Sequence, residues 1–180
     1  MSSLVKYLGV SILAGRSFNI NLQLMRQKFF RALNGILGKV GGSASESLTL
    51  SLISTFCLPI MMYACEAIWF SKKSLLRVEK AFNQVFSKMF RSFDTQTIKH
   101  CKFYMGSLPM SMRIHLRQLE FLNVYRRGSI QFSLELKNIL RGQVEEIVGF
   151  YEFGKNTLES IGKKSLRKPF WDFFTRDVFG

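Results

Sequence analysis

Residues 45–70 read SESLTLSLISTFCLPIMMYACEAIWF and form the longest weakly charged stretch of the chain. Glu46 opens the stretch, and Glu66 is the only other charged residue before Lys72. A run this long and apolar must be removed from water, either inside a protein core or inside a membrane. Which of these two environments it occupies decides the class of the protein.

A protein core is the environment that the residues of this stretch favour. Residues 48–65 only just reach the length of a membrane span, which takes roughly 20 apolar residues. Pro59 interrupts the run because proline lacks a backbone donor, and a carboxylate such as Glu66 is costly inside a bilayer. Polar residues also occur within it: Thr49, Ser51, Ser54 and Thr55. We therefore expect a buried helical segment with a kink at Pro59, or two buried helices that meet there; the alternative is a membrane-associated helical protein with one span near 48–70.

The composition describes a strongly basic chain with enough apolar residues for a core. Of its 180 residues, 47% are hydrophobic and 18 are phenylalanine, far more than disordered chains carry. Lys and Arg number 26 against 12 Asp and Glu, which gives a formal net charge of +14. The basic residues are dispersed among apolar ones, so we expect charged faces on folded helices. Such a charge favours polyanionic partners, chiefly nucleic acid or an anionic membrane surface.

The cysteines indicate a reducing compartment. Cys57, Cys65 and Cys101 form an odd set without a Cys-x-x-Cys pair, and no cleavable signal is recognised before them. Disulfides are rare in the cytosol and nucleus, where such cysteines stay reduced. We therefore expect an intracellular protein, cytoplasmic or nuclear.

The periodicity of apolar residues predicts a mainly α-helical bundle with a short N-terminal β-hairpin. Residues 1–18 carry crowded aliphatic residues and a turn at Ala14-Gly15-Arg16, which is typical of a hairpin. Apolar residues then recur at helical spacing through 22–40, 75–90 and 111–125. The predicted helix N-caps are Asn19 or Asn21, Ser43 or Ser45, and Ser71.

These patterns predict that the chain has three parts: the hairpin at 1–18, a helical domain at 19–92 and a C-terminal region at 93–180. Periodicity fades after residue 92, and a hinge or domain boundary is expected there. The last part is predicted to be helical, with glycines at Gly142, Gly149 and Gly154 that punctuate it.

The sequence contains no recognisable catalytic motif. Asp94, Asp172 and Asp177 are the only aspartates and include no adjacent pair, whereas two-metal enzymes need clustered carboxylates. Phosphate-binding Gly-rich loops, nucleophile elbows and zinc-protease motifs do not occur. His100, Cys101 and His115 lack the paired spacing of a zinc site. We predict no catalytic residue, no metal ligand and no cofactor, so the chain is not expected to be an enzyme as it stands.

Basic residues alternate with aromatic ones at several places. Examples are Lys28-Phe29-Phe30-Arg31, Lys88-Met89-Phe90-Arg91 and Tyr125-Arg126-Arg127. Cations neutralise phosphates, while rings either stack on bases or pack in the core. Because Phe29, Phe30 and Phe90 fall on apolar stripes, core packing is the expected use of these rings, and the arginines are the better candidates for nucleic acid.

Several short motifs follow one another along the chain. They are Lys6-Tyr7-Leu8-Gly9-Val10, the segment RQKFFRALN at 26–34, Cys57-Leu58-Pro59-Ile60 with Tyr63 and Glu66, the segment VEKAFN at 78–83, and Gly106-Ser107-Leu108-Pro109 followed by Arg113. In order and spacing they resemble the region after the polymerase site of reverse transcriptases from LINE-type, non-LTR retrotransposons. The resemblance covers roughly residues 5–125 and rests on several weak motifs in register.

The resemblance implies a C-terminal piece of such an enzyme. The hairpin with Lys6, Tyr7, Leu8 and Gly9 would lie beside the primer grip of a palm, and the helices at 19–92 would form the thumb that straddles a template-primer duplex. The fingers, the palm with its F/Y-x-D-D strand and the endonuclease would lie outside this sequence. Magnesium would serve the intact parent enzyme only.

The resulting hypothesis is a non-catalytic, thumb-like module that binds RNA or RNA–DNA hybrid without sequence preference. A palm supplied by another chain is a further expected partner, and a membrane is not. The candidate phosphate contacts are Lys28, Arg31, Lys72, Lys73, Lys80, Lys88, Arg113 and Arg117. Two rival hypotheses stay open: the membrane-associated helical protein, and a relic of a degenerate element that never folds stably.

Overall fold

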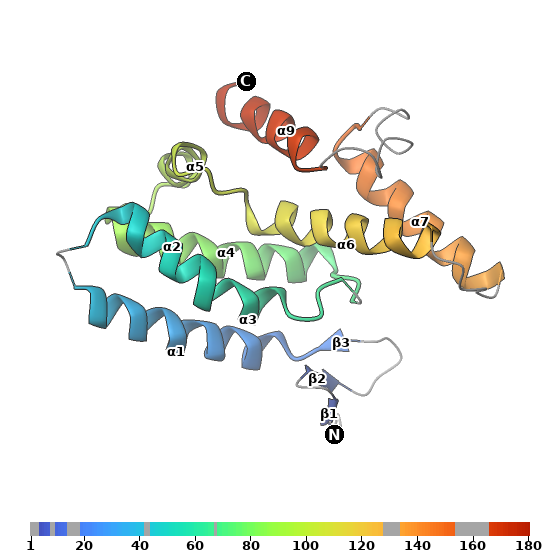
Figure 1. Ribbon diagram of the computed structural model, residues 1–180, viewed down its shortest axis with the longest axis horizontal. Coiled ribbons are helices and arrows are strands. Elements are labelled where there is room, and N and C mark those ends of the chain that lie inside the picture. Colours follow the sequence, from blue (N-terminus) through green and yellow to red (C-terminus); the bar gives the residue numbers. More distant parts are fainter. Residues whose placement is uncertain are drawn as a thin grey trace.

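The computed structural model describes residues 4–7, 10–13, 19–41, 44–66, 68–127, 134–153 and 166–180. Helices dominate these residues, so the prediction of a mainly α fold is confirmed. Figure 1 shows them arranged as one helical assembly. The helices are α1 (Leu22–Val40), α2 (Glu46–Phe56), α3 (Leu58–Met62), α4 (Lys72–Phe90), α5 (Thr95–Tyr104), α6 (Met110–Arg127), α7 (Leu134–Phe150) and α9 (Arg167–Phe179).

Short strands precede α1. They are β1 (Leu4–Tyr7), β2 (Val10–Leu13) and β3 (Asn19–Ile20), paired antiparallel in the order β1-β2-β3. The side chains of this segment lie outside the described residues, as do Leu8, Gly9 and residues 14–18. The interpretation of Lys6 to Gly9 as a palm hairpin therefore stays a prediction.

Local side-chain bonds determine where several helices begin. Asn21 Oδ1 accepts hydrogen bonds from the backbone N–H groups of Gln23 and Leu24, at 3.1 and 3.2 Å. Ser45 Oγ and Ser71 Oγ each accept from the N–H three residues later, at 3.3 and 3.2 Å. These bonds satisfy donors that the first turn of a helix leaves unpaired. The predicted caps Asn21, Ser45 and Ser71 are confirmed.

The stretch at 45–70 is broken as its proline predicts. α2 ends at Phe56, and α3 begins at Leu58 with Pro59 in its first turn, where a missing N–H costs no helical bond. Ile53, Cys57 and Met61 are fully buried along these two helices. Among the described residues, no helix is both long and apolar enough to cross a membrane.

A first apolar cluster joins α1, α2, α3 and α4. The inward face of α4 is its centre, with five fully buried side chains: Val78, Ala81, Phe82, Val85 and Phe86. Phe29 and Leu33 of α1 complete the cluster from the other side. Ile98, Met110 and Ile114 also belong to it, so residues on both sides of the predicted boundary at 92 share one core.

A second apolar cluster lies between α6, α7 and α9. Its members are Leu108, Met112, Leu119, Ile147, Tyr151, Leu166, Phe170 and Phe174. Figure 1 shows α6 side by side with α4 and running in the opposite direction, in agreement with their direct packing. α6 therefore connects the two clusters, because it contributes one face to each.

Candidate nucleic-acid interface

Four basic residues form a continuous stripe along the outside of α4: Lys73, Arg77, Lys80 and Lys88, which we call the basic stripe. All four are exposed. At about 100° per residue they fall within an arc of roughly 80°, and at 1.5 Å per residue they extend over about 22 Å. Arg91 continues the row at the C-cap of the helix. The opposite side of α4 is the apolar face buried in the first cluster.

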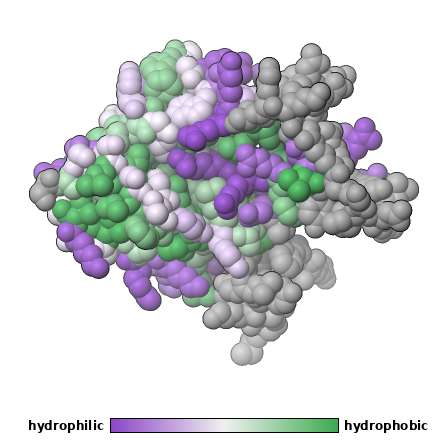
Figure 2. Space-filling view, in the orientation of Figure 1, coloured by the Kyte–Doolittle hydropathy of each residue, from purple (hydrophilic) through white to green (hydrophobic). Residues whose placement is uncertain are grey.

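The outer face of α1 carries a second set of exposed cations. Lys28, Arg31 and Lys39 are exposed and share one side of the helix at helical spacing. Lys88 Nζ of α4 donates a hydrogen bond to Asn34 Oδ1 of α1 at 2.7 Å, which brings the two helices together about one turn from Arg31. In Figure 2, hydrophilic side chains follow the lower left edge of the molecule, in the position that α1 has in Figure 1.

Acidic residues are almost absent from these two helices. α1 and α4 contain one carboxylate, Glu79, against nine basic residues. The nine are Arg26, Lys28, Arg31, Lys39, Lys72, Lys73, Arg77, Lys80 and Lys88. An exposed surface with one sign of charge attracts polyanions, since nearby carboxylates do not offset its potential. The position of Glu79 therefore decides how strong this surface is.

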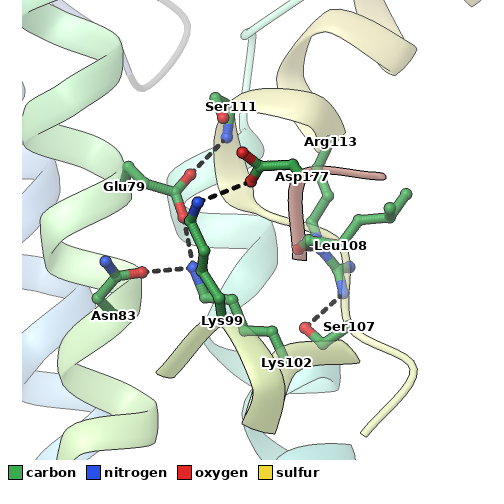
Figure 3. Close-up of polar contacts among 9 residues, drawn as sticks. All are labelled: Glu79, Asn83, Lys99, Lys102, Ser107, Leu108, Ser111, Arg113 and Asp177. Atoms are coloured by element: carbon green, nitrogen blue, oxygen red, sulfur yellow. Dashed lines mark hydrogen bonds and ion pairs between the residues drawn. The ribbon is translucent and has the colours of Figure 1, made fainter. Parts of the chain in front are cut away.

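Glu79 points inward and is neutralised inside the molecule. Its carboxylate accepts a hydrogen bond from Lys102 Nζ of α5 and, at 2.9 Å, from the backbone N–H of Ser111 of α6 (Figure 3). Lys102 also donates to Asn83 Oδ1 and is only 3% exposed. Burial lowers the pKa of Lys102, and the neighbouring Glu79 opposes that shift. One buried cation thus compensates the one carboxylate of α4.

Arg113 belongs to this interior network and not to the exposed basic surface. Its Nε donates to Leu108 O at 2.9 Å and its Nη2 to Ser107 Oγ at 3.1 Å (Figure 3). Its guanidinium lies 5.7 Å from the ring centroid of Phe82, and burial is the main cause that lowers its pKa to about 10. Because these contacts hold Arg113 inward, we do not retain it as a phosphate contact.

The remaining predicted phosphate contacts lie at different places on α1, α4 and α6. Lys73, Lys80 and Lys88 lie on the basic stripe, whereas Lys72 is exposed on another side of α4 and lines a cavity. Arg117 is exposed on α6, where its Nη1 lies 3.6 Å from Glu66 Oε1. Lys28 and Arg31, on α1, belong to the surface described above. Five of the eight predicted contacts therefore lie exposed on α1 and α4, two helices that the bond from Lys88 to Asn34 joins.

Arg77 is a member of the basic stripe that the sequence-based site prediction left out. It lies four residues after Lys73 and three before Lys80, the spacing of residues that share a helix face. This spacing was a usable signal in the sequence. Lys39, eight residues after Arg31 on α1, was left out in the same way.

Possible metal ligands do not gather in the part of the chain that the structure describes. No group of three or more His, Cys, Asp or Glu side chains there could hold a metal ion. His100 packs against Phe179, with ring centroids 5.5 Å apart. His115 is bonded instead through its Nδ1 to Tyr151 Oη at 2.8 Å. The two imidazoles therefore have different neighbours.

Comparisons with known proteins do not assign the chain to a family. No family model, no curated protein and no solved structure matches it. The resemblance to retrotransposon reverse transcriptases stays a prediction, and the function has to be argued from the surface described above.

Proposed function

We propose that this chain binds nucleic-acid duplexes, RNA–DNA hybrid foremost, through the basic stripe of α4 and the outer face of α1. The observation that carries the proposal is the separation of charge on α4. Four of its five cations lie on one exposed face, while its single carboxylate is turned inward and paired with Lys102.

The dimensions of the basic stripe suit a phosphate backbone. Each strand of a duplex carries one phosphate per roughly 3.4 Å along the axis, so a row of about 22 Å faces several phosphates. Contacts of long Lys and Arg side chains to phosphates fix orientation and carry no sequence information. Binding would therefore be electrostatic and tolerant of sequence.

A rigid support strengthens such a surface. Val78, Phe82 and Val85 of α4 are fully buried in the first cluster. α4 therefore cannot rotate about its axis without disrupting that cluster. The bond from Lys88 to Asn34 ties the basic stripe to α1. Cations held in place on a rigid helix lose less conformational entropy on binding than cations on a mobile tail.

The thumb of a reverse transcriptase is the module that this proposal most resembles. The sequence resemblance supports it, since two of its segments, 26–34 and 78–83, lie on α1 and α4. In this role the chain clamps a duplex and does no chemistry, so we expect no nucleotide incorporation when primer-template and nucleotides are supplied.

Salt dependence of binding is the test of this surface. With four to five phosphates neutralised, the logarithm of the association constant should fall with the logarithm of salt concentration with a slope of about −4. In the double variant Arg77→Gln with Lys80→Gln, the slope should become shallower by about 2, equally for different sequences. Fluorescence anisotropy of a labelled RNA–DNA hybrid at several salt concentrations measures both slopes.

A matched control variant removes two positive charges outside the proposed interface. Arg141 on α7 and Lys168 on α9 are both exposed, so Arg141→Gln with Lys168→Gln changes net charge equally. We expect its salt slope to equal that of the unmodified chain. Equal effects of the two double variants, or salt-independent binding by folded protein, would refute an interface on α4.

A further inference from the structure

A cavity of about 570 Å³ lies between the first turns of α4, the start of α6 and the end of α7. Its size is in the range of small-molecule sites, roughly 300–1,000 Å³. Most of its lining is apolar or aromatic. The residues that matter here are Trp69, Leu76, His115, Ile147, Phe150 and Tyr151.

Aromatic rings form one continuous wall of this cavity. The ring centroids of Phe150 and Tyr151 are 4.9 Å apart, and the His115 ring lies 5.5 Å from Tyr151. Phe150 is 62% exposed and offers its ring to an occupant, whereas Tyr151 is 1% exposed and supports Phe150 from the interior. Trp69 adds a further ring to the lining. Such surfaces favour a flat occupant, because aromatic rings stack or meet edge to face.

The polar lining of the cavity combines charged side chains, Lys72, Glu79 and Glu146, with a neutral hydrogen-bonded pair. His115 Nδ1 and Tyr151 Oη are hydrogen-bonded at 2.8 Å. Burial lowers the pKa of His115 to about 4 and raises the pKa of Tyr151, so both are neutral at pH 7. Glu79 also lines the cavity, but its charge is compensated by Lys102. A heterocycle with donors and acceptors matches the neutral pair of His115 and Tyr151, which offers hydrogen bonds and no charge.

The cavity borders the basic stripe. Lys72 and Leu76 of α4 line it, while Lys73 and Lys80 of the basic stripe lie next to them around the same helix, at about 100° per residue. An occupant of the cavity could therefore remain attached to a phosphate held by the basic stripe.

We propose that this cavity receives an unpaired nucleobase at the end of the bound duplex. The inference rests on the proposed function, because the basic stripe holds the backbone from which the base extends. The base would stack on the exposed ring of Phe150, with its edge toward His115. Stacking of this kind depends little on base identity, since every base has a flat face.

Matched hybrids test this proposal. An RNA–DNA hybrid with a single unpaired nucleotide at one end should bind about tenfold more tightly than the blunt hybrid. An abasic nucleotide at the same position should give no gain. In a Trp171→Phe background Trp69 is the only remaining tryptophan, and its emission should be quenched by the overhanging hybrid alone.

Exposed phenylalanines supply the variant and its control. Phe150 and Phe93 are 62% and 89% exposed, so replacing either by Ala should leave the fold intact. Phe150→Ala should abolish the tenfold gain while leaving blunt-hybrid binding unchanged, and Phe93→Ala should change neither. A gain that survives Phe150→Ala, or that the abasic overhang also gives, overturns the cavity proposal alone. Failure of the blunt hybrid to bind overturns the proposed function, and this inference with it.

Discussion

Lys102 is a cation that this strongly basic chain keeps in its interior. Its Nζ donates to Glu79 and Asn83 and lies 5.3 Å from the ring centroid of Phe82. Removing one partner of a buried ion pair leaves the other charge uncompensated, which costs more than removing both. The pair therefore links the helices α4 and α5 at the point where α4 turns its only carboxylate away from the basic stripe.

A double-mutant cycle measures this coupling. Lys102→Met should lower the free energy of unfolding by about 3–5 kcal/mol, because the Glu79 carboxylate keeps its charge without a cation. Adding Glu79→Gln should recover part of that loss, so that the double variant loses at least about 1 kcal/mol less than the sum of the single ones. Urea unfolding of the four proteins gives the values; strictly additive losses would mean that the two groups do not interact.

His115 makes the fold sensitive to acid. Burial lowers its pKa to about 4, whereas in the unfolded chain it is near 6.5, so the unfolded state binds a proton first as pH falls. The stability that neutral His115 contributes is complete above pH 6.5 and is lost as the pH falls toward 4. Between pH 7 and 4.5 the loss should be about 2.5 kcal/mol.

Replacing His115 by Gln isolates this contribution. Gln retains a group that can hydrogen-bond to Tyr151 but does not titrate, and His100 is present in both proteins. The unmodified chain should therefore lose about 2.5 kcal/mol more than His115→Gln over this pH interval, measured by urea unfolding at each pH. Parallel pH profiles of the two proteins would show that His115 is not held neutral by burial.

At the scale of elements, α6 organises the interior through two opposite faces. Met110 and Ile114 belong to the first cluster, and Met112 and Leu119 to the second. Gln118 lies between these faces and is 3% exposed. Its Nε2 donates to Cys65 O at 3.2 Å and to Ile68 O at 2.8 Å, so α6 also holds the end of the segment 45–70 in place.

Gln118→Leu should reveal the contribution of this contact. Leucine fills similar space but leaves two buried carbonyl groups without their donor, which should lower the free energy of unfolding by about 1–3 kcal/mol. Gln84→Leu is the matched control, since Gln84 is exposed on α4 and should change stability by less than about 0.5 kcal/mol. Thermal or urea unfolding compares the two; equal effects would show that the carbonyl contacts contribute no stability.

At the scale of the whole molecule, charge is distributed unevenly. The cations of the ion pairs lie on α5, α6 and α7: Lys99 pairs with Asp177 at 2.9 Å, Lys102 with Glu79 of α4, Arg117 with Glu66 and Arg141 with Glu145. The outer faces of α1 and α4 carry cations in a neighbourhood that is poor in carboxylates. Among the described residues, the cations on these two faces form a local positive field, which steers a polyanion to that side of a protein.

The helix boundaries and the apolar faces of the helices were predictable because contacts between residues close in sequence decide them. Asn21, Ser45 and Ser71 bond to backbone groups two or three residues away, and Pro59 acts on its own turn. Apolar spacing likewise identified the buried face of α4. For the site, the spacing of basic residues located most of the basic surface, but it could not show that Arg113 turns inward.

The sequence by itself determined a basic, mainly helical chain whose apolar stretch at 45–70 breaks at Pro59. Only the tertiary structure decided which charges stay exposed. Lys102 meets Glu79 across 23 residues, His115 meets Tyr151 across 36, and Gln118 meets Cys65 across 53. Such pairings depend on how whole helices pack, because burial and the loss of hydration are properties of the assembled core and are not encoded in spacing along one helix.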